Sequence, residues 1–62
     1  MKFVIRFRYI PPYDSMTPLM HIPIEQTIIE AETSELAWSS FMGGISKEHQ
    51  DWLKREEIFQ YT

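Results

Sequence analysis

The clearest hydrophobic pattern in the chain lies near its start, in Lys2–Ile10 (KFVIRFRYI). Large apolar side chains fall at every second position, at Phe3, Ile5, Phe7 and Tyr9, with mostly basic side chains between them. A period of two places alternate side chains on opposite faces of a β-strand. The pattern therefore predicts a central strand whose apolar positions face a core.

Two prolines follow this strand, and a second extended segment is predicted over residues 19–31. Pro23 has no amide proton to donate to a ladder, so this strand should lie at an edge or be interrupted there. Its later part, EQTIIEAE, has strong strand propensity. We expect Ile29 and Ala31 to face the core and Ile28 to share the opposite face with Val4.

A helix is predicted over residues 33–42 (TSELAWSSFM), with Thr33 or Ser34 as its N-cap. Pairs spaced by four residues give it an apolar stripe, namely Ala37 with Phe41 and Trp38 with Met42. Gly43-Gly44 should end the helix, because glycine adopts a left-handed conformation at low cost. Ser46 can then cap a second short helix over residues 47–55, and residues 56–61 (EEIFQY) read as a last strand.

These elements predict one α+β domain over residues 1–62, in the order ββα(α)β. The sheet should be antiparallel and three-stranded, in the order 2-1-3, with one main helix and a second short helix. The path from the second strand to the third should be a right-handed crossover.

A chain of 62 residues buries about 60% of the surface that its unfolded form exposes, so its stability margin is thin. Small domains usually add disulfides, a metal or a second subunit. The chain has no cysteine and only two histidines, so self-association is the remaining means of stabilisation. We expect a homodimer formed through an open sheet face or an edge strand.

The net charge of −3 argues against general nucleic-acid binding, which depends on neutralising phosphates. The charge is unevenly divided, because the first 24 residues carry a net +2 and the remainder a net −5. No signal peptide and no apolar run of about 20 residues is present, so we expect a cytoplasmic protein with no membrane segment.

Enzyme chemistry has little support in the sequence. There is no cysteine nucleophile, no recognisable Ser-His-acid spacing and no glycine-rich phosphate loop. The two histidines lie in different segments, without further metal ligands nearby in the sequence. We therefore predict a protein that is not an enzyme and that uses no cofactor or metal.

Five residues are candidates for binding. Arg6 and Arg8 lie on the face of the central strand opposite its aromatic positions, where they can grip an anion or pair with glutamates of neighbouring strands. Tyr13 belongs to the Tyr13–Pro18 loop, which is either a passive connection or a contact site. Trp38 and Trp52 are large for so small a core, and tryptophan is a frequent binding hot spot.

The spacing of Ile29, Ala31, Thr33 and Ala37 follows an "extended–Ala–x–Thr–x–x–x–Ala" junction between strand and helix. In this pattern and in its size the chain resembles small accessory and counter-defence proteins of bacteriophages. The resemblance implies a non-enzymatic inhibitor that binds a host or defence protein. Its alternative implication is a sponge that holds a small anionic signalling nucleotide between subunits.

Overall fold

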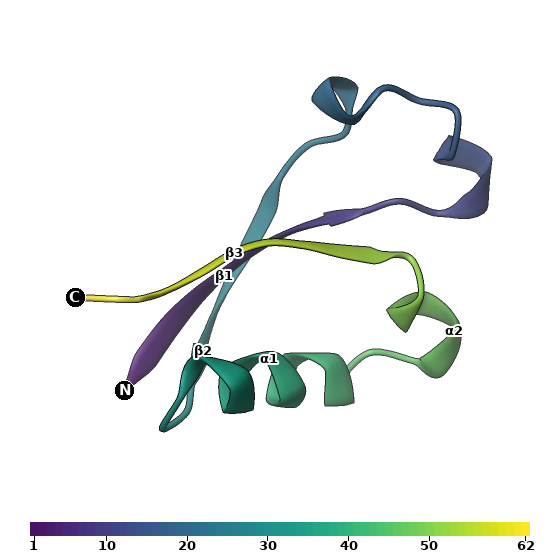
Figure 1. The fold of residues 1–62 in the computed structure, drawn as a ribbon. Helices are drawn as coiled ribbons and strands as arrows, with labels where there is room; N and C mark the ends of the chain where they lie inside the picture. The colour runs from purple at the N-terminus through teal and green to yellow at the C-terminus, as the bar shows by residue number, and fades with distance from the viewer.

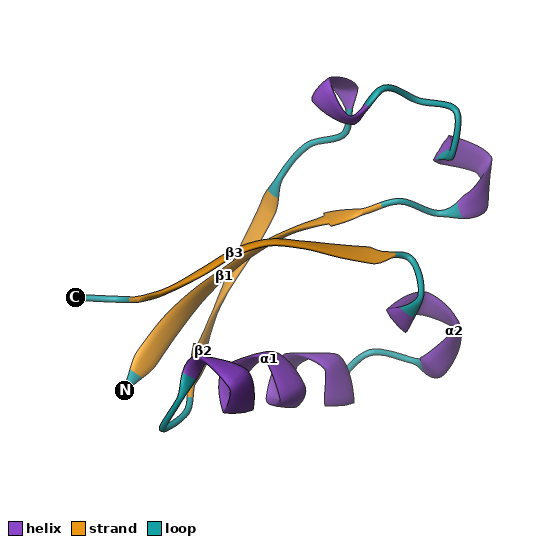
Figure 2. Cartoon of the chain, viewed as in Figure 1, coloured by secondary structure: helices purple, strands orange, loops and turns teal.

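The computed structural model describes all 62 residues. Its three strands form one antiparallel sheet in the order β2-β1-β3, with bounds β1 Lys2–Tyr9, β2 Glu25–Glu30 and β3 Leu53–Gln60 (Figure 1). Helix α1, Ser34–Gly43, runs along one face, and the short helix α2, Lys47–Gln50, precedes β3 (Figure 2). The predicted fold class and strand order are confirmed. Neither helix has the length and apolar character that crossing a membrane requires.

The core lies between the central strand and α1. Phe3, Ile5 and Ala37 form its buried centre, and Ile5 and Ala37 are fully buried. Partly buried side chains pack around this centre, namely Phe7, Ile29, Ala31, Trp38, Phe41 and Ile58. The predicted phases of the central strand and of β2 are therefore confirmed.

Helix α1 begins at the predicted cap and ends at the predicted glycine pair, but not through a left-handed glycine. The Thr33 hydroxyl oxygen accepts a hydrogen bond from the Leu36 amide at 3.2 Å, which satisfies one of the free donors of the first turn. Gly44 has a φ of −87°, so the expected left-handed glycine is wrong. Instead, the Gln50 side-chain amide donates to the carbonyl oxygens of Met42 and Ile45, each at 2.9 Å. A side chain from α2 thus stabilises the end of α1.

The second helix is shorter than predicted, and the last strand is longer. Helix α2 ends at Gln50, and Leu53 already begins β3. In this register Leu53 pairs with Tyr9 and Lys54 with Arg8. These residues complete the ladder along the far half of β1, and this pairing outweighs the helical preference of the local sequence.

The second extended segment is also interrupted, and only Glu25–Glu30 forms a strand. The earlier part contains a 3-10 turn at Leu19–His21, and a second such turn lies at Pro12–Asp14. Together, residues 10–24 form an arm that projects from one end of the sheet, while both termini lie at the other end (Figure 1). All four prolines of the chain lie in the arm.

Replacement of Ile5 by alanine should destabilise the domain by about 2–5 kcal/mol, because a fully buried side chain is lost from the core. That range is comparable with the whole stability of a small domain. The milder Ile5→Val should cost about 0.5–1.5 kcal/mol. Urea denaturation followed by circular dichroism measures both, with Ile28→Ala as the exposed β-branched control. Equal losses of unfolding free energy in Ile5→Ala and Ile28→Ala would contradict the assignment of Ile5 to the core face and Ile28 to the outer face.

Candidate functional site

The sheet face turned away from α1 has no α-helix over it, and on that side Figure 2 draws only the two 3-10 turns of the arm, beyond one end of the sheet. An apolar row crosses all three strands of this outer face, because Val4 pairs with Ile28 on one side and with Phe59 on the other. Val4 is buried at 4% exposure, whereas Ile28 and Phe59 are 48% and 40% exposed. The row therefore has a covered centre and two apolar ends that contact solvent.

A β-bulge determines which charges lie beside this row. Arg6 pairs with Glu57 and the next residue, Phe7, pairs with Arg55, so Glu56 is an extra residue in β3. Successive side chains of a regular strand point to opposite faces, but a bulge can re-aim one of them. Here the bulge lets both Glu56 and Glu57 reach arginines of the outer face.

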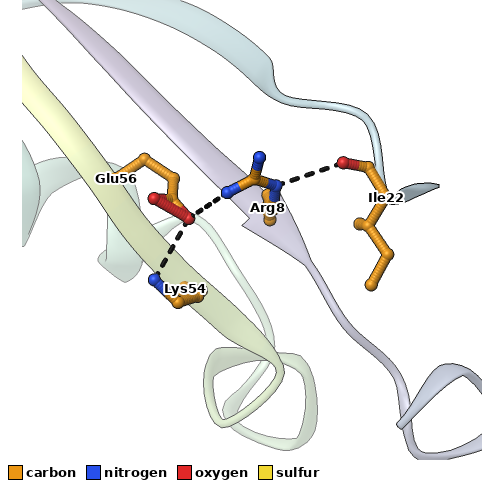
Figure 3. Close-up of polar contacts among 4 residues, drawn as sticks. All are labelled: Arg8, Ile22, Lys54 and Glu56. Carbon is orange, nitrogen blue, oxygen red and sulfur yellow. Dashed lines mark hydrogen bonds and ion pairs between the residues drawn. The ribbon is translucent and has the colours of Figure 1, made fainter. Parts of the chain in front are cut away.

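Arg8 is held in a network that links β1, β3 and the arm (Figure 3). Its guanidinium donates to the Glu56 carboxylate, and its Nε donates to the Ile22 carbonyl oxygen at 3.1 Å. Lys54 donates to the same Glu56 oxygen at 3.1 Å. The side chains of Arg8 and Glu56 are only 18% and 21% exposed. Hydrogen bonds from Lys54 and then Arg8 lower the pKa of Glu56 below its ordinary value, so it is ionised at neutral pH.

Arg6 is the more accessible of the two arginines. Its guanidinium lies 3.5 Å from the Glu57 carboxylate and 5.6 Å from the centre of the Phe59 ring. Its Nε donates to the Gln26 side chain at 3.4 Å, and its own side chain is 46% exposed. Both arginines therefore pair with glutamates of the neighbouring strand, which is the alternative that the sequence left open. Only Arg6 behaves as a surface residue.

The other predicted binding residues lie elsewhere. Trp38 packs at the edge of the core, with its ring centre 5.7 Å from that of Phe41. Trp52 is half-buried, 4.9 Å from the His49 ring and 5.7 Å from the Tyr9 ring. Both tryptophans thus have packing roles that account for their burial.

Tyr13 lies on the arm and is 84% exposed. It lines a pocket of about 230 Å³ at the base of the arm, together with Tyr9, Pro11, Asp14, Thr17, His21, Ile22, Pro23 and Glu25. Burial, with smaller contributions from nearby Tyr13 and Glu48, raises the pKa of Tyr9. No lysine or arginine lines this pocket, so it offers no fixed positive charge to an anion.

The structure therefore brings together Arg6 and Arg8 but not the full predicted set. It adds Phe59, which the sequence analysis did not select because its face depends on the bulge. No group of three or more metal-ligating side chains is assembled. No family model, curated protein or solved structure matches this chain.

Substitution of Glu56 by glutamine should lower stability at neutral pH, because Arg8 and Lys54 lose an ionised partner. The pKa of a glutamate in the unfolded chain is about 4.5, and the pKa of Glu56 in the folded chain is lower. The stabilisation that ionised Glu56 gives the fold is therefore fully present above pH 4.5. It is lost as the pH falls through the folded value. The difference in unfolding midpoint between wild type and Glu56→Gln should therefore narrow below pH 4.5, as thermal melts across pH will measure.

Glu57→Gln is the matched control, since it changes the adjacent residue in the more exposed ion pair with Arg6. Exposed pairs contribute little to stability, so this variant should differ little from wild type at any pH. If the difference in unfolding midpoint between wild type and Glu56→Gln stays unchanged down to pH 3, the carboxylate charge of Glu56 is not the stabilising feature.

Proposed function

We propose that the chain is a non-enzymatic protein-binding module and that its contact surface is the outer face. The observation that carries this proposal is the apolar row of Ile28, Val4 and Phe59, which no helix covers. Charged and polar rows border it on both sides, with Gln26, Arg6 and Glu57 on one side and Glu30 with Lys2 on the other.

This layout matches the anatomy of protein–protein interfaces, which have an apolar centre inside a polar rim. Aromatic and arginine side chains are enriched in such interfaces, and here Arg6 lies over the Phe59 ring. Phe59 is also exposed enough to enter a pocket of a partner. The row thus supplies apolar area, and the flanking charges supply orientation and specificity.

The pairing of the charges favours a protein over an anionic ligand. Arg6 and Arg8 each already contact a glutamate, so a phosphate would have to compete with these carboxylates. A protein surface that carries both signs of charge can instead complement the alternating rim. This supports the protein partner over the alternative of a nucleotide sponge. The narrower prediction that the partner is a host or defence protein rests on the sequence resemblance and stays a prediction.

The test compares Phe59→Glu with Leu36→Glu. Both positions are exposed large hydrophobics, but Leu36 lies on α1 rather than on the outer face. The tagged wild-type chain is used to capture a partner, which is then purified and titrated against each variant. We expect Phe59→Glu to weaken affinity by at least about tenfold, since a buried aromatic anchor contributes more than 1.4 kcal/mol. Leu36→Glu should bind as wild type does.

Equal affinity of the two variants would contradict the outer face as the contact surface. A thermal-shift screen with nucleotides addresses the sponge alternative, because a ligand that binds only the folded state raises its apparent stability. Stabilisation by several degrees that disappears in Arg6→Gln would favour the sponge over the protein-binding module. Turnover of a bound nucleotide would overturn the non-enzymatic assignment.

A further inference from the structure

The arm is an ordered projection with an exposed apolar tip. Its base is held by the bond from Arg8 to the Ile22 carbonyl oxygen and by the burial of Pro11 and Ile22. Its four prolines restrict the backbone further. Yet Met16 and Met20 are 92% and 84% exposed. A segment that is ordered in advance loses little conformational freedom when it docks.

An apolar groove lies at the same end of the sheet, beside α2. It measures about 560 Å³ and is lined by Phe7, Tyr9, Glu25, Phe41, Gly44, Ile45, Ser46, His49 and Leu53. No residue of the arm lines it. The arm and α2 project to opposite sides of the sheet end (Figure 1), so the chain does not fill its own groove.

The chain carries both an exposed apolar tip and an open apolar groove, so a second copy of the chain can supply the occupant of the groove. The radius of gyration is 12.2 Å, whereas a compact domain of this length has about 10.6 Å. Only five hydrophobic side chains are buried. A domain with so small a core needs an additional means of stabilisation, and it has no cysteine and no metal cluster. Association with itself is the means that remains.

The arm and groove suit this contact better than the sheet edges do. The free edge of β3 carries a bulge and the charged run Lys54–Glu57, features that discourage edge-to-edge pairing. The other edge strand, β2, is only six residues long and begins just after Pro23, and a short edge bounded by proline also limits edge-to-edge pairing. The arm is mainly apolar, and so is the groove, in which five of the nine lining residues are hydrophobic.

We propose that the chain forms a two-fold dimer in which the Met16–Met20 tip of each arm docks in the apolar groove of the other copy. Because arm and groove lie at one end of the molecule, a two-fold axis beyond that end lets both contacts form at once and closes the assembly. The dimer leaves both outer faces free. It is thus independent of the proposed function and replaces the expected contact through a sheet face or edge.

Cysteine cross-linking tests this contact without background, because the native chain has no cysteine. Met16→Cys on the arm and Ser46→Cys in the groove are prepared as separate chains, mixed, and oxidised gently. We expect a disulfide between positions 16 and 46, identified by mass spectrometry, as the main linked product. Met16→Cys mixed with Leu36→Cys is the control, since Leu36 is also exposed but lies outside the groove.

A second measurement uses sedimentation of charge variants that leave the fold intact by circular dichroism. Met16→Glu should weaken self-association by at least about tenfold, as burying an unpaired charge in the groove is unfavourable. Ile45→Glu should do the same from the groove side. A mixture of the two variants should associate more tightly than either alone, because one arm–groove contact is then intact.

A wild-type chain that stays monomeric at about 100 µM would overturn the proposal. So would a dimer that gives no more 16–46 cross-link than the control, or one that Met16→Glu leaves unchanged. These results would not affect the outer-face titrations, because Met16 and Ser46 belong to neither the apolar row nor its rim. Failure of one proposal is thereby distinguished from failure of the other.

Discussion

The structure depends on the packing of α1 against the central strand, where Phe3, Ile5 and Ala37 form one buried cluster and the last two are fully buried. The small side chain of alanine lets the helix approach the sheet closely, and the larger apolar groups fill the space around it. Of the two α-helices, only the ten-residue α1 packs against the sheet core, since α2 has four residues. One face is therefore packed and the other is left open, which makes the outer face available for binding.

The single irregularity of the sheet has consequences far beyond β3. Because Glu56 is the extra residue of the bulge in β3, its carboxylate forms an ion pair with Arg8 and does not point towards the core. Arg8 in turn donates to the Ile22 carbonyl oxygen and so holds the base of the arm. One bulge thus connects the last strand, the first strand and the arm. Arg8 is best understood as a positioning residue, and Arg6 as the arginine available to a partner.

Two apolar surfaces result, and they differ in physical character. On the outer face the apolar row is bordered by charges of both signs, which suits recognition of a partner with a matching pattern. The tip of the arm carries methionines, whose flexible side chains adapt to irregular grooves. A domain with so few buried residues gains stability when such a tip is covered. The proposed assembly and the proposed recognition therefore use separate surfaces of one small chain.

Local sequence was enough to predict the features that depend on near neighbours. The alternation in Lys2–Tyr9 determined the core-facing side of β1, and the Thr33 cap marked the start of α1. The residues of β2 took the expected faces, and this strand lies at an edge and begins only after Pro23. With three strands and one main helix predicted in the order ββαβ, the α+β class and the strand order followed from a right-handed crossover between the second and third strands.

Only the tertiary structure decided the features that depend on distant pairing. Residues 53–55 fit a helix by local preference, yet they form a strand because β1 needs hydrogen-bond partners along its whole length. The bulge, the outward position of Phe59 and the anchoring of Arg8 all follow from that register. Arg8 and Glu56 are 48 residues apart in the chain, and no local pattern encodes their meeting. Their contact exists because the two strands lie side by side in the folded sheet.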